Sequence, residues 1–300
     1  MRVSGAPLHD AALITGRVSA RDAPGELCRL GVKGRVDGQV ISVPRLPEHL
    51  LTDQEAALDA MERAVDFAGP VDAVGLGSLL AVVAGRGASL AERVSVPVTT
   101  GAAATSWAAV RNALDLLDGR DQPVAVLGFS SVVGLQVAGA LREHGVTVVA
   151  GGSGKALARK ASKIGVELMD ERTAAGSADL VLGCATTGGT LEASALRAGA
   201  TLLDVALPPT LKPGPRPRGV RVFAGEAVEL PAGWTRGVWG RLYHVFSGYG
   251  LRSVYACLLE PMVMALQGRR EPYALGRRVD LRGFTEAAQE LGLKPRLARH

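Results

Sequence analysis

The middle of the chain alternates between short, continuously apolar runs and segments in which apolar residues recur at helical spacing. Continuous apolar runs bounded by glycine are typical of strands buried on both faces of a parallel sheet. We expect such strands in "PVAVLG" (123–128), "VTVVAGG", "ADLVLGCATT", "ATLLDVALP" and "GVRVFAG" (219–225). The segments between them, "SVVGLQVAGALREHG", "GKALARKASKIG" and "TLEASALRAG", indicate two helices and a helical turn. The alternation predicts an α/β fold with a doubly wound parallel sheet and right-handed crossovers.

Helical patterns flank this block on both sides. Residues 103–118 carry Trp107, Val110, Leu114 and Leu117 at helical spacing. In the first hundred residues, strand-like runs accompany a helix through "AALDAMERAVDFA", which we expect Thr52 to cap, with Glu55 completing a capping box. Near the other end, "RLYHVFSGYGLRSVYACLLEPMVMALQG" (241–268) and "LRGFTEAAQELG" also predict helices.

These patterns divide the chain into three expected segments. We expect residues 1–102 to form an N-terminal α/β domain. Residues 103–226 form the dinucleotide-binding, Rossmann-like domain, and residues 227–300 form a C-terminal helical segment.

Composition narrows the class of protein. Of 300 residues, 47% are hydrophobic and 21% charged, and no run is long and apolar enough to span a bilayer. Three cysteines give no disulfide framework and favour a reducing, cytoplasmic location. The net charge of +5 is dispersed, without stacking aromatics, zinc spacing or another metal-ligand cluster. We therefore expect no nucleic-acid partner and no metal, although a basic surface suits an acidic protein partner.

A glycine-bearing loop follows the first strand of the alternating block. In "VAVLGFSSVVG", Gly128 ends the expected strand and Gly134 begins the helix, with Ser130 and Ser131 between them. Backbone amides at such a turn face a pyrophosphate, and the helix dipole assists binding. The pattern departs from G-x-G-x-x-G, so a glycine-rich connection without a ligand is the alternative.

The residues after the second strand bear on the choice of dinucleotide. No carboxylate follows that strand to bind a ribose 2′-hydroxyl; Ser153, Lys155 and Arg159 follow instead. This set favours a 2′-phosphate and hence NADPH, unless the three residues are simply an exposed helix start. "GGSGKA" fails as a P-loop because Ala156 stands where Ser or Thr must bind magnesium.

Cys257 is the cysteine with an unusual local sequence. Pro261, four residues later, cannot donate to the carbonyl of Cys257, so the helix either kinks after the thiol or begins there. A helix N-terminus would favour the thiolate, but free cysteines are usually inert core residues. We expect Cys28 to be packed, and Cys184 to lie near a bound cofactor without taking part in chemistry.

Several segments in order resemble the aldehyde-forming long-chain acyl-(acyl-carrier-protein) reductases. They are "GRVDGQVISVPRLPEHLLT", "VDAVGLGSLLAVV", "VTTGAAATSWAAVRNAL", "VAVLGFSSVVG" and "SVYACLLEPMVMALQG" with the residues after it. The resemblance covers most of the chain from about residue 34 onward.

The resemblance implies roles for particular residues. Cys257 falls on the family's acylated nucleophile, Glu260 on the glutamate that follows it, and Gly128 and Gly134 on its cofactor-loop glycines. The segments with Gly77 and Ser78, and with Thr99, Thr100 and Gly101, fall on its substrate side. His244 could act as acid or base, or be a buried structural histidine. The chain departs from the family at Ala102, Ser131, Pro261 and Leu230.

The function implied is the NADPH-dependent reduction of an acyl thioester to an aldehyde through an acyl-enzyme on Cys257. The substrate would be carried by an acyl carrier protein or by coenzyme A, and residues 1–102 would bind the acyl chain. One alternative is an oxidoreductase like shikimate dehydrogenase or glutamyl-tRNA reductase. The other is a non-catalytic NADPH-binding or scaffold protein.

Overall fold

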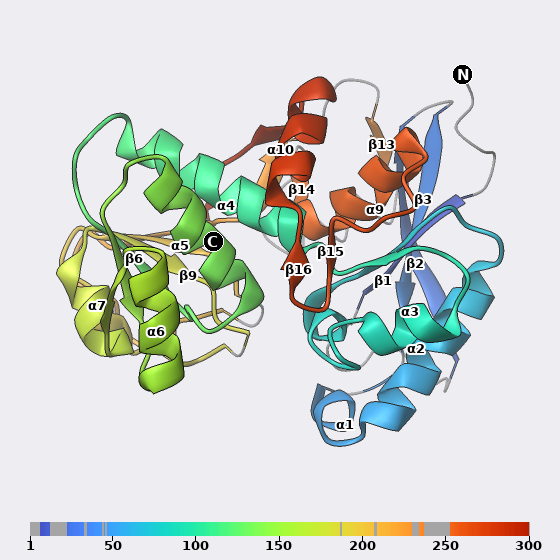
Figure 1. The fold of residues 1–300 in the computed structure, drawn as a ribbon, viewed down its shortest axis with the longest axis horizontal. Helices are drawn as coiled ribbons and strands as arrows, with labels where there is room; N and C mark the ends of the chain where they lie inside the picture. Colours follow the sequence, from blue (N-terminus) through green and yellow to red (C-terminus); the bar gives the residue numbers. More distant parts are fainter. Residues whose placement is uncertain are drawn as a thin grey trace. The chain divides into compact units, whose positions relative to one another are not determined.

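The computed structural model describes residues 7–12, 23–32, 35–43, 45, 47–186, 188–206, 209–229, 234–236 and 253–299. The chain forms two compact units (Figure 1). The first contains residues 1–104 and 229–294, and the second contains residues 105–228 and 295–300. The C-terminal residues that we expected to form a separate segment are therefore packed largely with the N-terminal residues.

A six-stranded mixed sheet forms the centre of the first unit. Its strand order is β13-β2-β3-β1-β4-β5. The strands β3, β1, β4 and β5 run parallel, while β2 and β13 run antiparallel to their neighbours. The strands are β1 (Pro7–Ala12), β2 (Gly25–Val32), β3 (Val36–Ser42), β4 (Val74–Leu76), β5 (Val98–Thr99) and β13 (Trp234–Arg236).

Helices cover both faces of this sheet. The core on one face joins Ile41, Val74 and Val98 to buried residues of α2 and α3. On the other face, α9 contacts β1, β3, β4 and β5. The elements outside the sheet are α1 (Pro47–Thr52), α2 (Gln54–Ala68), η1 (Ser78–Ala81), α3 (Ala88–Arg93), β14 (Ser253–Tyr255), α9 (Ala256–Gln267), β15 (Ala274–Leu275), β16 (Arg278–Val279) and α10 (Leu281–Glu290).

Two expected helix boundaries in this unit are wrong. The N-cap of α2 is Asp53, whose Oδ1 accepts from the backbone amide of Ala56 at 2.9 Å, whereas Thr52 is the last residue of α1. Asp and Thr are both good N-cap residues, so the sequence alone did not separate them. The long C-terminal helix was also expected to include residues 253–255, but these form the strand β14 and the helix begins at Ala256.

The second unit contains a seven-stranded sheet in the order β18-β11-β10-β9-β6-β7-β8. All pairs are parallel except the antiparallel edge pair of β11 and β18. Numbered from β6, the six parallel strands have the order 3-2-1-4-5-6 of a doubly wound dinucleotide-binding fold. The predicted fold class is therefore confirmed. The strands are β6 (Val124–Leu127), β7 (Val148–Gly151), β8 (Glu167–Met169), β9 (Leu180–Gly183), β10 (Thr201–Asp204), β11 (Arg221–Ala224) and β18 (Ala298–Arg299).

Helices pack against this second sheet. The helix α5 contacts β6 and β7, while α7 and η2 pack on a face that includes Leu127, Val181 and Leu202. The short strand β8 and the helix α7 were not expected from the sequence. The helical elements are α4 (Ala102–Leu117), which begins in the first unit, α5 (Val132–Glu143), α6 (Lys155–Lys163), α7 (Glu171–Ser177) and η2 (Ala193–Ala195). The remaining short strands are β12 (Ala227–Glu229) and β17 (Lys294–Pro295).

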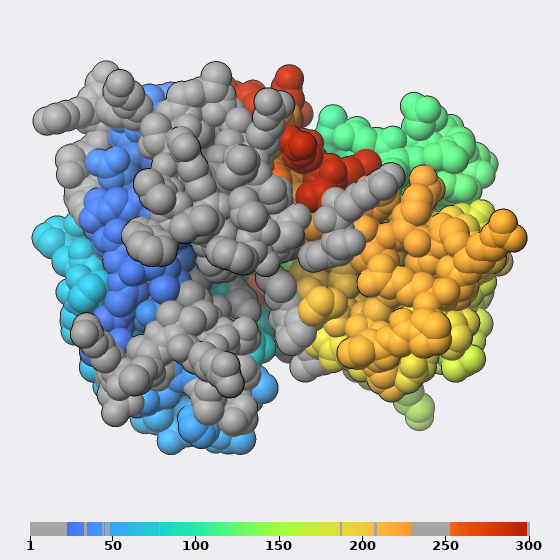
Figure 2. All heavy atoms as spheres, turned by 180° about the vertical axis from the view of Figure 1, so that it is seen from behind, coloured from blue at the N-terminus to red at the C-terminus, as the bar shows by residue number. Residues whose placement is uncertain are grey.

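The proline- and arginine-rich connection between β10 and β11 lies largely exposed, and Figure 2 shows it within the orange surface. Its Lys212 pairs with Glu192 at 2.8 Å. Among the helices in the described ranges, none is long and apolar enough to cross a membrane.

Candidate active site

Cys257 is the second residue of α9 and is half-buried, whereas Cys28 and Cys184 are buried. The strand β14 leads directly into the helix, and the N-cap residue Tyr255 supplies no side-chain cap. The first turn of a helix has amides without intrahelical partners, and the helix dipole stabilises negative charge there. Cys257 lies in this first turn, at the positive end of the helix dipole.

Pro261 lies inside α9, which continues to Gln267. The sequence left open a kink after the thiol or a helix that starts there. The helix starts one residue before Cys257, so the thiol lies in its first turn and the proline follows it. Because proline has no N–H, the usual i+4 donor to the carbonyl of Cys257 is absent.

The Thr-Thr-Gly turn after β5 packs directly against Cys257. Gly101 has a φ of 74°, in the left-handed region that favours glycine. A Cβ atom built on Gly101 would lie 2.5 Å from the Cβ of Cys257 and 2.7 Å from its Cα. Only glycine allows this approach, so the structure brings together two segments that the sequence separates by 156 positions.

Glu260 is fully buried and lies one helical turn after the thiol. Its Oε1 accepts from the hydroxyl of Thr99, and its Oε2 accepts from the backbone amide of Ala104 at 2.8 Å. Ala104 is in the first turn of α4, a helix that begins directly after Gly101. Since Gly101 has no side chain to cap that helix, Glu260 caps it from α9. Burial raises the pKa of Glu260 to about 7, although the Thr99 hydroxyl and the backbone amides of Ala104, Ala103 and Gly101 favour the charged form.

The segment after α9 fixes the other side of the turn. The carbonyl of Ala274 in β15 accepts from the Thr100 amide at 2.9 Å and lies 3.0 Å from the hydroxyl oxygen of Thr99. Strand alternation explains this geometry, because Val98 belongs to the core on the α2 face and Thr99 points the opposite way. The amide of Thr100 is thus occupied by the protein itself.

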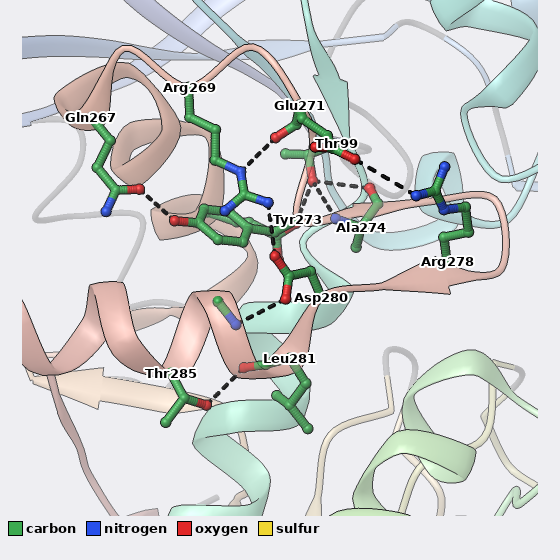
Figure 3. A network of polar contacts seen from close by, with 12 residues as sticks. Thr99, Gln267, Arg269, Glu271, Tyr273, Ala274, Arg278, Asp280, Leu281 and Thr285 are labelled. Atoms are coloured by element: carbon green, nitrogen blue, oxygen red, sulfur yellow. Dashed lines mark hydrogen bonds and ion pairs between the residues drawn. The ribbon is translucent and has the colours of Figure 1, made fainter.

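A polar network holds this segment in place (Figure 3). The guanidinium of Arg269 lies 3.8 Å from the centroid of the Tyr273 ring and donates to Asp280 Oδ2 at 2.8 Å. The hydroxyl of Tyr273 donates to Gln267 at the end of α9. Asp280 in turn caps α10 by accepting from the Gly283 amide at 2.9 Å. These bonds join α9, β15 and α10 into one support for Thr99 and Thr100.

The remaining substrate-side residues lie at the end of β4. Gly77 follows that strand and Ser78 begins η1. In the parallel pair of β4 and β5, Gly75 lies opposite Thr99, so Gly77 falls at the level of Gly101. His244, the expected acid or base, lies outside the described residues.

In the second unit, Gly128 and Gly134 make the turn from β6 into α5. Gly128 has a φ of 67°, and a Cβ on it would lie 2.6 Å from the Cα of Ala185, just after β9. A Cβ on Gly134 would lie 3.0 Å from the carbonyl carbon of Gly128. Glycine is therefore needed for the tight turn and for the close packing of helix and loop, which are roles of the first and last glycines in a dinucleotide loop. The loop lies at the carboxyl ends of β6 and β9, where the strand order reverses.

Ser131 stands at the position of the middle glycine, and its side chain makes hydrogen bonds within the protein. Its hydroxyl accepts from the Gly134 amide at 2.8 Å and donates to the carbonyl of Cys184 at 2.7 Å. We expected Ser131 to contact the cofactor, but its side chain is the buried N-cap of α5. Its neighbour Ser130 is exposed. Burial, followed by the charges of Asp204, Glu226 and Glu171, raises the pKa of the Cys184 thiol, so that thiol stays protonated.

The three residues expected to select a 2′-phosphate are exposed and lie just beyond β7. Ser153 follows the strand, Lys155 begins α6, and Arg159 lies one turn further along that helix. These residues and the glycine turn both lie at the carboxyl ends of strands of the second sheet.

Sequence reasoning missed Glu171, whose Oε1 accepts from the Gly128 amide at 3.0 Å. The only local signal is a carboxylate following the third strand, 43 residues after the loop.

No protein-family model matches the chain. Over 283 residues, it is 24% identical to the aminotransferase PigE of Serratia sp. (strain ATCC 39006), a match to 84% of this chain and 31% of that protein. The chain thus spans about a third of the length of this curated relative.

Solved structures with similarity to this chain include the L-tryptophan dehydrogenase of Nostoc punctiforme. The match has 16% sequence identity, covers 95% of this chain and 84% of that chain, and has a TM-score of 0.43. They also include the transhydrogenase of Sinorhizobium meliloti. That match has 14% sequence identity, covers 69% of this chain and 72% of that chain, and has a TM-score of 0.35. The strand order described above, rather than these likenesses, establishes the doubly wound fold.

Proposed function

We propose that the chain reduces an acyl thioester to an aldehyde, with Cys257 as the nucleophile and NADPH as the reductant. The observation that carries this proposal is the half-buried Cys257 in the first turn of α9, packed against the Thr-Thr-Gly turn. A chain that also has a dinucleotide-type glycine turn has both of the parts that such a reaction needs.

The thiolate of Cys257 attacks the thioester carbonyl, the carrier thiol leaves, and an acyl-enzyme remains. The tetrahedral oxyanion needs donors close to the sulfur. The amide of Thr100 is bonded to the Ala274 carbonyl, so it is not available for this role. Glu260 and Thr99 position the turn around the thiol.

When bound, NADPH would supply a hydride to the acyl carbon, and Cys257 would leave as the thiolate when the resulting thiohemiacetal releases the aldehyde. The Gly128 turn and the first turn of α5 would hold its pyrophosphate, and Ser130 lies exposed on this loop. Ser153, Lys155 and Arg159 would bind the 2′-phosphate, because serine and two cations are the donors that an added phosphate needs.

The curated relative is compatible with this chemistry. Aminotransferases convert carbonyl compounds to amines, and an aldehyde is such a carbonyl compound. A reductase segment related to part of a protein named an aminotransferase would therefore supply a substrate of suitable class. The thiol carrier of the acyl group would be an acyl carrier protein or coenzyme A.

Intact-protein mass spectrometry tests the proposal. Wild type, Cys257→Ser and the control Cys184→Ser are incubated with carrier-linked and coenzyme A-linked acyl thioesters, without NADPH. We expect an acyl adduct on wild type and Cys184→Ser, no adduct on Cys257→Ser, and release of aldehyde when NADPH is added.

An adduct that persists with NADPH would contradict the reductase. The absence of any adduct, with dinucleotide binding intact, would favour an ordinary dehydrogenase or a non-catalytic binding protein.

A further inference from the structure

The carboxylate of Glu171 lies on the glycine turn of the second unit. Its Oε1 accepts from the Gly128 amide at 3.0 Å, and the side chain is half-buried. Glu171 is the first residue of α7, which follows the third strand of the doubly wound sheet, β8. The Glu171 side chain therefore extends from the segment after the third strand, β8, to the end of the first strand, β6.

The backbone is shaped to allow this reach. A Cβ atom on Gly151, the last residue of the second strand, β7, would lie 3.3 Å from the Cα of Glu171 and 3.0 Å from a methyl carbon of Leu127. The small residue at the end of β7 thus leaves room for the start of α7 to come close to β6.

The neighbouring carboxylate is committed elsewhere. Asp170 is the N-cap of α7, and its oxygens accept from the amide and the hydroxyl of Thr173. Glu171 is thus the carboxylate of this pair that faces the loop. The charge of Glu171 also contributes to the raised pKa of Cys184, at the neighbouring end of β9.

A dinucleotide-binding fold usually has an acid at the end of its second strand, where it binds the adenosine ribose. In this chain the second strand ends at Gly151 and is followed by Gly152 and Ser153. We propose that Glu171 replaces that acid from the third strand and accepts a hydrogen bond from the 3′-hydroxyl of the adenosine ribose.

This inference rests on the proposed function only in that the second unit binds a nicotinamide dinucleotide. NADH and NADPH share the 3′-hydroxyl, so Glu171 contributes to both. The exposed Ser153, Lys155 and Arg159 are left to bind the 2′ substituent. Recognition of the ribose is thereby divided between two segments: the residues after β7, which bind the 2′ substituent, and the start of α7, which supplies the carboxylate.

Isothermal titration of the full chain with NADPH and with NADH tests the assignment. Glu171→Gln keeps an acceptor for the Gly128 amide but removes the charge. We expect it to weaken both dinucleotides by about tenfold or more, because a hydrogen bond to a charged acceptor is stronger than one to a neutral amide. Glu171→Asp keeps the charge but is one methylene shorter, so it should also weaken both. The matched control is Glu167→Gln, an exposed carboxylate on β8 four residues earlier, which should bind as wild type does.

Unchanged affinities in both Glu171 variants would overturn the assignment. Tighter NADPH binding with weaker NADH binding in Glu171→Gln would also overturn it, because the carboxylate would then face the 2′ position. Wild type that binds neither dinucleotide would refute this inference and the proposed function together. Wild type that binds both but never forms an acyl-enzyme would refute the proposed function alone.

Discussion

Replacing Glu260 by Gln should remove a large part of the pH dependence of stability. Burial raises the pKa of this carboxyl from its ordinary value of 4.5 to about 7. The folded protein therefore binds the proton more tightly than the unfolded chain does. The stabilising effect of that proton is complete below pH 4.5 and is lost as the pH rises towards 7.

The magnitude follows from the two values. They differ by about 2.5 pH units, and each unit corresponds to about 1.4 kcal/mol, so the folded state loses about 3 kcal/mol across this window. Gln resembles the protonated carboxyl: it is neutral, can accept from the Ala104 amide and can bond to the Thr99 hydroxyl. Its contribution does not change with pH.

Urea unfolding of wild type and Glu260→Gln, followed by circular dichroism from pH 4 to pH 8, measures the effect. The free energy of unfolding of the variant minus that of wild type should rise by about 3 kcal/mol over this range. Glu290→Gln, an exposed carboxylate on α10 in the same unit, is the matched control. Thr99→Val removes a donor that favours the charged form and should move the midpoint to higher pH.

A difference between variant and wild type that stays constant from pH 4 to pH 8 would refute this reasoning. So would a difference that falls as the pH rises, because the carboxylate would then be more stable in the folded protein than in water.

Two further predictions concern the surroundings of the thiol. Iodoacetamide at neutral pH should alkylate Cys257 at least tenfold faster than Cys28 or Cys184, because both of these are buried. Peptide mass spectrometry after timed quenching measures the three rates. Equal rates would contradict a reactive thiol at Cys257. Gly101→Ala should destabilise the protein by about 2–4 kcal/mol and slow that alkylation, because its Cβ would overlap Cys257 in addition to the strain at positive φ. Gly69→Ala is the control, because Gly69 has the same φ of 74° and the added atom has nothing within 4 Å. It should lower stability by only about 1–2 kcal/mol and leave alkylation unchanged. Equal losses of stability in the two variants would show that the contact with Cys257 is not what requires glycine.

The sequence predicted the central strands of the second unit because they are buried on both faces. The strand β8 escaped notice because it is a short edge strand whose residues are exposed or half-buried, so "VELMDERTAAGS" has no continuous apolar run. The helix α7 was missed because its residues also lack a continuous apolar run.

The candidate site was predicted only in part. The resemblance singled out Cys257 and the Thr-Thr-Gly turn, and the structure brings them into contact. The bond between Thr99 and Glu260 joins residues 161 positions apart, and Glu171 reaches a loop 43 positions earlier. Periodicity and local spacing report on neighbours along the chain, so neither bond leaves a pattern that they could detect.

The first unit is built from two pieces of chain, and this affects how it is made on the ribosome. One face of its sheet lacks α9, which contacts four of the strands, until that helix has been synthesised. From residue 104 to residue 267, 163 residues must be added. At about 5–20 residues per second, that takes roughly 8–33 s. Almost all of the second unit is translated during this interval, while an apolar sheet face waits for its helix. Chaperone binding to stalled nascent chains should therefore be strongest between these two lengths and fall once α9 has emerged.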